Sequence, residues 1–71
     1  MSQKPTEYDQ GLYYHQLGLI KHRQGDYKRA VDYYERAISI REKILSPVDP
    51  ALATSYNNIG LVYSNLGEYS R

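Results

Sequence analysis

The chain has 71 residues with no Cys, no Phe and no Trp, and its net charge is only +1. Without Cys, neither a disulfide nor a thiolate metal site can stabilise so short a chain. The balanced charge does not fit a nucleic-acid-binding domain, and no apolar run is long enough to cross a membrane. A folded form must therefore depend on close helix packing or on further copies of the chain.

The first ten residues, MSQKPTEYDQ, lack the apolar core of a secretory signal. Together with the absence of Cys, this favours a cytoplasmic location. We expect residues 1–6 to form a disordered lead that ends at Thr6. Thr6 is also a candidate N-cap, because Asp9 follows three residues later as in a capping box.

All nine aromatic residues are Tyr. A tyrosine contributes a large apolar area, but its hydroxyl must stay hydrated or hydrogen-bonded. A chain with no other aromatic residue therefore favours a thin layer of helices, in which no side chain lies far from water.

The central stretch, residues 27–45, has an apolar stripe at three- and four-residue intervals, which predicts an amphipathic helix. Gly25 and Asp26 before it suit a helix end followed by an N-cap. Asp49 with Pro50 is a second helix start, and Gly67 predicts a second helix end. The fold class is therefore all-α, an antiparallel helix-turn-helix repeat of three helices at about 7–24, 27–45 and 50–66.

The chain also repeats itself. A shift of 42 residues aligns 12–29 with 54–71 and gives six identities in eighteen pairs, where chance predicts about one. The identical pairs include the glycines within and after the helix, Gly18 with Gly60 and Gly25 with Gly67. We conclude that the repeat is genuine and that Gly18 lets two helices of a hairpin pack closely.

The residue order resembles the tetratricopeptide repeat, with an aromatic residue, a Leu-Gly pair, an Ala-aromatic-Ala series in a second helix, and a Pro. In the first copy these places are held by Tyr14, Leu17, Gly18, Ala30, Tyr34, Ala37 and Pro50. The usual period is about 34 residues. The period of 42 is similar to the extended repeats of kinesin light chains and related proteins.

The resemblance implies that residues 7–71 contain one full repeat, 11–52, and the first helix of a second, 53–71. The third helix would then lack a hairpin partner, and its face of Tyr56, Ile59 and Tyr63 would be exposed. Repeat units cannot bury their apolar faces alone. Either the chain is a piece of a longer array, or another copy covers this face, and we expect a homo-oligomer formed through it.

In this family the first helices of the repeats line a concave surface on which peptides lie. The resemblance therefore implies a protein–protein interaction scaffold, with Asn58 at a position that hydrogen-bonds peptide backbone. The predicted groove residues are His15, Leu19, His22, Asn57, Asn58, Leu61 and Asn65. Two alternatives stay open: a self-assembling structural unit, and a soluble surface without a ligand.

No other site is predicted. His15 and His22 are seven residues apart, whereas a helical pair of metal ligands is typically four apart. We expect no enzyme, no metal and no cofactor, because no nucleophile stands beside a Gly-rich turn or a His/Asp set. The basic residues of the central helix, Arg41 included, alternate with acidic ones, which indicates a solvated, ion-paired face.

Overall fold

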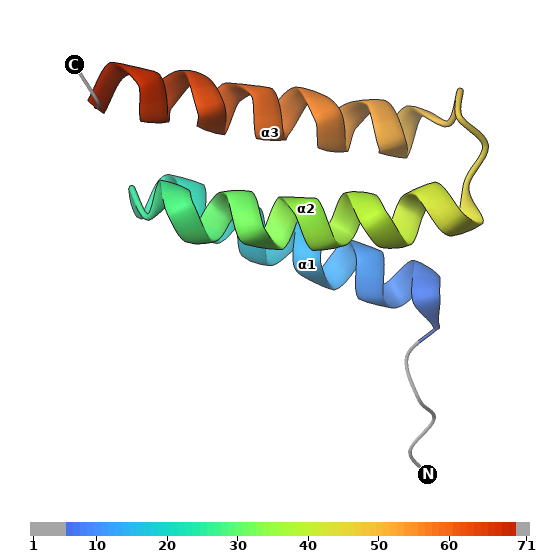
Figure 1. The fold of residues 1–71 in the computed structure, drawn as a ribbon. Helices are drawn as coiled ribbons and strands as arrows, with labels where there is room; N and C mark the ends of the chain where they lie inside the picture. Colours follow the sequence, from blue (N-terminus) through green and yellow to red (C-terminus); the bar gives the residue numbers. More distant parts are fainter. Residues whose placement is uncertain (1–5, 70–71) are drawn as a thin grey trace, which may run out of the picture.

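The computed structural model describes residues 6–69, which form three helices and, within that range, no strand (Figure 1). Helix α1 is Glu7–Arg23, α2 is Tyr27–Ile44 and α3 is Pro50–Tyr69. Consecutive helices run antiparallel, and α2 lies between the other two (Figure 1). The predicted all-α helical repeat of three helices is therefore confirmed.

Helix α1 begins with the predicted capping box. The backbone N–H of Asp9 donates to Thr6 Oγ1 at 3.1 Å, and the Thr6 N–H donates to Asp9 Oδ2 at 3.4 Å. Two backbone donors that the first helical turn leaves unpaired are thus satisfied. Thr6 therefore belongs to the helix cap, whereas the rest of the predicted disordered lead lies outside the described residues.

The turn between α1 and α2 depends on Gly25, whose φ of +80° favours glycine. The Gly25 N–H donates to the His22 carbonyl and the Asp26 N–H to the Lys21 carbonyl, at 3.0 and 2.9 Å. This pair of bonds is a Schellman motif, which pairs the last carbonyls of a helix. Asp26 occupies the N-cap position of α2 as predicted, but its side chain makes no capping hydrogen bond.

Helix α3 begins as predicted, with Pro50 in its first position and Asp49 before it. The Asp49 carboxylate accepts from the Ala51 N–H at 2.8 Å. The predicted end at residue 66 is wrong, because the helix continues through Gly67 to Tyr69. Glycine permits a turn but does not impose one. Within residues 6–69 there is no later helix whose packing would stabilise a turn at Gly67, so the backbone there stays helical.

The core is the layer between α2 and α3 together with the α1 side of α2. Its buried apolar members are Ala30, Tyr34, Ala37, Ile38, Leu52, Ile59 and Val62. The molecule measures 47 × 30 × 13 Å along its principal axes. A slab this thin agrees with an aromatic content of Tyr alone, because most rings can keep their hydroxyls near water.

A close contact between helices joins Gly18 of α1 to Tyr34 of α2. A Cβ placed on Gly18 would lie 2.7 Å from Tyr34 Cδ1, closer than a methyl group tolerates. Tyr34 is fully buried, and its hydroxyl has no hydrogen-bond partner in the described part of the chain, which offsets part of the gain from burying the ring. The predicted packing role of Gly18 is confirmed, and the side chain that faces it is Tyr34.

Candidate functional site

Four of the seven predicted groove residues meet in pairs between α1 and α3. The Asn65 side-chain amide donates to His22 Nε2 at 2.7 Å, and the Asn58 amide lies 3.5 Å from His15 Nε2. Each pair spans 43 residues, because histidines and asparagines both recur at a seven-residue interval. Helices α1 and α3 are therefore joined by two His–Asn bridges along one side of the molecule, of which His22–Asn65 is the shorter.

The other three predicted groove residues share this side but make no contact of that kind. Leu61 is 58% exposed, Asn57 is exposed and Leu19 is half-buried. In sequence, Leu19 lies between the two histidines, and Leu61 lies between Asn58 and Asn65. Since residues three and four apart lie on one helix face, each helix presents an apolar side chain between two polar ones. We call these seven residues the α1–α3 face.

His15 is held as a neutral imidazole. Burial, and secondly the positive charge of Arg41, lower the pKa of His15 below its ordinary value of 6.5. Because the Asn58 amide nitrogen can only donate, Nε2 must accept, which leaves the proton on Nδ1. Nδ1 is buried, with no hydrogen-bond partner in the described part of the chain. The His15 ring packs against Tyr34, with 5.6 Å between ring centroids.

Arg41 is a structural residue that the sequence interpretation misplaced. Its side chain is only 8% exposed, so its assignment to a solvated, ion-paired face is wrong. The guanidinium donates to the Ala51 carbonyl at 3.1 Å and to Ser55 Oγ at 2.7 Å, and thereby joins α2 to the start of α3. The signal was present in the sequence, because Arg41 continues the stripe of Ala30, Tyr34 and Ala37.

Gly11 allows Arg41 to lie where it does. A Cβ on Gly11 would meet Arg41 Cγ at 3.2 Å, which is tighter than an ordinary contact. Within a helix, glycine by itself costs about 1 kcal/mol relative to alanine. In the structure Gly11 is buried and brings α1 close to the Arg41 stem.

The second candidate face lies between α2 and α3, on the other flank of α3. Here Tyr56 and Tyr63 are 47% and 50% exposed, as predicted for the self-association residues. For Ile59 the prediction of an exposed side chain is wrong, because Ile59 is only 8% exposed. The reason is that α2 packs against α3 as well as α1, so Ile59 meets the same core as Ile38.

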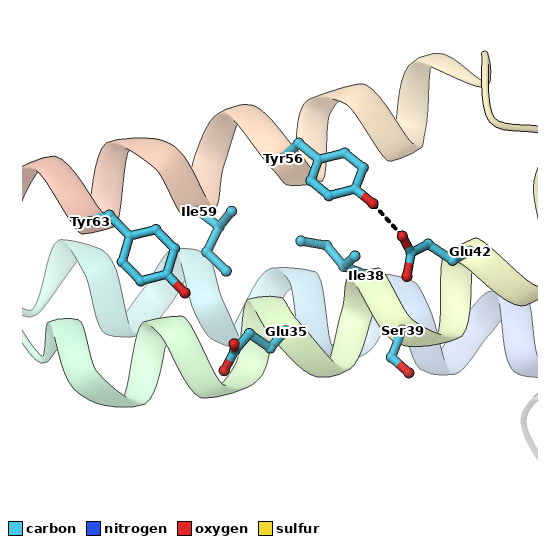
Figure 2. Close-up of a pocket in the computed structure, with 7 residues that line it drawn as sticks. All are labelled: Glu35, Ile38, Ser39, Glu42, Tyr56, Ile59 and Tyr63. Carbon is cyan, nitrogen blue, oxygen red and sulfur yellow. Dashed lines mark hydrogen bonds between the residues drawn. The ribbon is translucent and has the colours of Figure 1, made fainter.

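These side chains border a groove of about 400 Å³ (Figure 2). Its lining consists of Glu35, Ile38, Ser39, Glu42, Tyr56, Ile59 and Tyr63. The Tyr56 hydroxyl donates to the Glu42 carboxylate across the groove (Figure 2). This bond is the chief cause that raises the pKa of Tyr56 above its ordinary value. We call this surface the α2–α3 groove.

Neither face contains recognisable catalytic or metal-binding chemistry. Within residues 6–69 there is no cluster of three or more His, Cys, Asp or Glu side chains that could hold a metal ion. His15 and His22, the only histidines of the sequence, each bond to a different asparagine. None of the helices described here is long and apolar enough to span a membrane.

Comparison with known families gives the class of the protein. The family model for the tetratricopeptide repeat matches residues 9–71. The chain belongs to the tetratricopeptide repeat family, whose repeats are in general non-catalytic scaffolds that bind protein partners. No curated protein and no solved structure matches the chain.

Proposed function

We propose that this protein is an interaction module whose α1–α3 face binds an extended segment of a partner protein. The observation that carries the proposal is the pair of bridges, His22 with Asn65 at 2.7 Å and His15 with Asn58 at 3.5 Å. Seven helical residues correspond to about 10.5 Å along the axis. An extended peptide covers that distance in about three residues. The two bridges are therefore spaced for repeated contacts to one extended backbone.

The chemistry of the bridges suits a peptide backbone. An asparagine amide has two N–H donors and an acceptor oxygen, so a bond to histidine uses part of its capacity. The remaining donor and acceptor match the N–H and C=O groups that an extended segment presents. The exposed Leu61 lies between the two asparagines and would contact an apolar side chain of the segment. We therefore expect a partner segment with an apolar residue between polar backbone contacts.

Selection from a library of random peptides, followed by fluorescence anisotropy with the selected peptide, tests this proposal. Asn65→Ala and Leu61→Ser should each weaken binding about tenfold, since one buried contact contributes on the order of 1–2 kcal/mol. Tyr63→Ser, on the other flank of α3, serves as the matched control and should leave affinity unchanged. The proposal would be overturned if Asn65→Ala and Leu61→Ser kept their helicity and still bound the peptide with wild-type affinity.

Self-assembly through α3 is the second candidate function. It is supported by Tyr56 and Tyr63, two half-exposed rings on one flank of this helix. Sedimentation velocity over a dilution series measures it directly. Association that is lost in the Tyr56→Ser/Tyr63→Ser double variant, and retained in Leu61→Ser, is the expected result. A chain that stays monomeric at every concentration contradicts self-assembly and leaves the peptide-binding proposal intact.

A further inference from the structure

The two His–Asn bridges differ in length. The Asn65 amide nitrogen lies 2.7 Å from His22 Nε2, whereas the Asn58 amide nitrogen lies 3.5 Å from His15 Nε2, at the outer limit of a hydrogen bond. These two histidines are the only ones in the sequence. Both bridges join α1 to α3 on the face to which we assign peptide binding. A change of charge on either histidine therefore occurs at the binding face itself.

The direction of the His22–Asn65 bond depends on the charge of the imidazole. An amide nitrogen carries two hydrogens and only donates, so His22 Nε2 must be the acceptor. An imidazole nitrogen accepts only in the neutral ring, because both ring nitrogens carry a hydrogen in the protonated form. The bond in the structure therefore belongs to neutral His22. The carbonyl oxygen and the second amide hydrogen of Asn65 remain for a bound segment.

Protonation of His22 is incompatible with this orientation of Asn65. The Nε2–H of the protonated ring and an N–H of the amide would face each other across 2.7 Å. Both residues are half-buried, so water replaces the lost bond incompletely. A half-turn of the Asn65 amide brings its carbonyl oxygen to Nε2 and restores a hydrogen bond. The amide nitrogen, with both hydrogens, then lies where the oxygen was.

The surroundings of His22 contain no described carboxylate that pairs with it. From α2 the Tyr27 ring packs edge-on, with 5.6 Å between ring centroids. Its neighbours along α1 are Lys21 and Arg23, which carry the same positive charge as a protonated imidazole. Among the side chains that the structure describes, no Asp or Glu forms an ion pair with His22. The Asn65 carbonyl oxygen is thus the acceptor that a single side-chain rotation brings to Nε2.

The His15 bridge resists the same change. Burial, and secondly the positive charge of Arg41 on α2, lower the pKa of His15 below its ordinary value. The Tyr34 ring of α2 lies against it, and from α3 it faces the Asn58 amide. No carboxylate of the described side chains pairs with this ring either. Asn58 therefore keeps its orientation to a lower pH than an ordinary histidine would allow.

We propose that His22 and Asn65 form a pH-sensitive switch, which reverses the hydrogen-bonding character of the α1–α3 face at its His22 end. With neutral His22, the Asn65 oxygen accepts from a backbone N–H of the bound segment. With protonated His22, the Asn65 amide nitrogen faces that N–H, and the bond is lost. This inference rests on the proposed peptide binding and adds its regulation by pH. Histidine is the side chain whose charge changes between about pH 5 and about pH 8.

The first test requires no peptide. Heteronuclear NMR spectra of the intact chain, recorded between about pH 7.5 and about pH 5, follow the Asn65 side-chain amide and the His22 ring nitrogens separately. We expect the Asn65 amide resonances to move along the same titration curve as the His22 ring. Asn65 resonances that stay fixed while His22 takes up its proton would overturn the proposal. So would a His22 ring that remains neutral throughout this range.

The second test measures peptide affinity by fluorescence anisotropy. A peptide selected at about pH 7.5, and free of His, Asp and Glu, should bind the wild type roughly tenfold more weakly at about pH 5, because one hydrogen bond is lost. In His22→Gln, whose side-chain oxygen accepts from Asn65 at either pH, the ratio of the two affinities should be close to one. In His22→Lys, whose side chain only donates, the ratio should also be close to one.

His15→Gln is the matched control. It removes the other histidine, and with it the loss of stability in acid that His15 causes, but it retains the switch. The roughly tenfold ratio should therefore persist in this variant. Circular dichroism at each pH checks that every variant is folded. A ratio close to one in His15→Gln would assign the pH dependence to His15 and contradict the proposal.

The outcomes separate the switch from peptide binding itself. A peptide that binds equally well at both pH values contradicts the regulation but supports the proposed function. A tenfold ratio that persists in His22→Gln contradicts the switch and likewise leaves peptide binding intact. A library that yields no binding peptide contradicts the proposed function and the regulation with it. In that case the NMR titration still decides whether Asn65 turns with His22.

Discussion

Gly18 and Tyr34 fit together so closely that a single methyl group cannot be added between them. A Cβ on Gly18 would lie 2.7 Å from Tyr34 Cδ1 and 2.8 Å from Cε1. The ring is fully buried. Gly60 has the same place in the second repeat, but the space around it is open. One residue type at equivalent positions thus has opposite tolerance for substitution.

Gly18→Ala is accordingly expected to destabilise the fold, and Gly60→Ala to stabilise it. Overpacking in a filled core costs about 1–3 kcal/mol. In an exposed helix, replacing Gly by Ala stabilises by up to about 1 kcal/mol. Urea denaturation monitored by circular dichroism compares the two variants with the wild type. Equal midpoints for both variants would contradict the close contact at Gly18.

Arg41→Met should destabilise the chain by about 2 kcal/mol. The substitution keeps an apolar stem over Gly11 but leaves Ser55 and the Ala51 carbonyl without their charged donor. Lys43→Met is the matched control, since Lys43 is an exposed residue of the same helix, and should change the free energy of unfolding by less than about 0.5 kcal/mol. Similar values for both variants would show that Arg41 acts as an ordinary surface residue.

Acidification should weaken the fold through His15. Its pKa in the folded chain is lowered by burial and by Arg41, so the unfolded chain takes up the proton first as pH falls. Stability from this source is fully present above the unfolded pKa of about 6.5 and is lost as pH falls from there through the folded pKa. His15→Gln removes the titrating group. Urea midpoints measured at about pH 7.5 and about pH 5 should differ less in this variant than in the wild type. An unchanged pH dependence contradicts the assignment to His15.

The two aspartates at helix starts should differ in their contribution to stability. Asp49→Ala removes a capping bond of 2.8 Å and should cost about 1 kcal/mol. Asp26→Ala removes no capping bond, only an exposed ion pair with Arg29 at 3.6 Å, and should cost less than about 0.5 kcal/mol. Thermal unfolding of both variants measures the difference. A larger effect at Asp26 would mean that its side chain caps α2 in solution.

Local sequence patterns predicted most of the fold. Thr6 with Asp9, and Asp49 with Pro50, are start signals whose physics lies within a few residues, and the structure reproduces both. The repeat added Gly18 as a point of close packing. Gly67 shows the limit of such reasoning, since its counterpart Gly25 ends α1, whereas Gly67 remains helical. Whether a glycine ends a helix depends on whether a turn there is stabilised by packing between helices. Local sequence does not contain that information.

The faces were harder to predict, because they depend on which helix lies beside which. The register of His15 and His22 against Asn58 and Asn65 requires α1 and α3 to be neighbours, which the repeat resemblance implied. Ile59 was assigned to an exposed face because α3 was expected to lack a partner, but α2 packs against α3 as well as α1. The peptide-binding role of the α1–α3 face stays a prediction.

The position of α2 between two helices also has a consequence for how the molecule opens. Helices α1 and α3 each contact α2 far more than they contact one another. Detachment of α3 can therefore leave the hairpin of α1 and α2 in place, whereas loss of α2 removes the support of both neighbours. Amide hydrogens of α2 should accordingly exchange with solvent only through global unfolding, and those of α3 through a smaller, local opening. The cooperative unfolding of this chain therefore depends on its middle helix, α2.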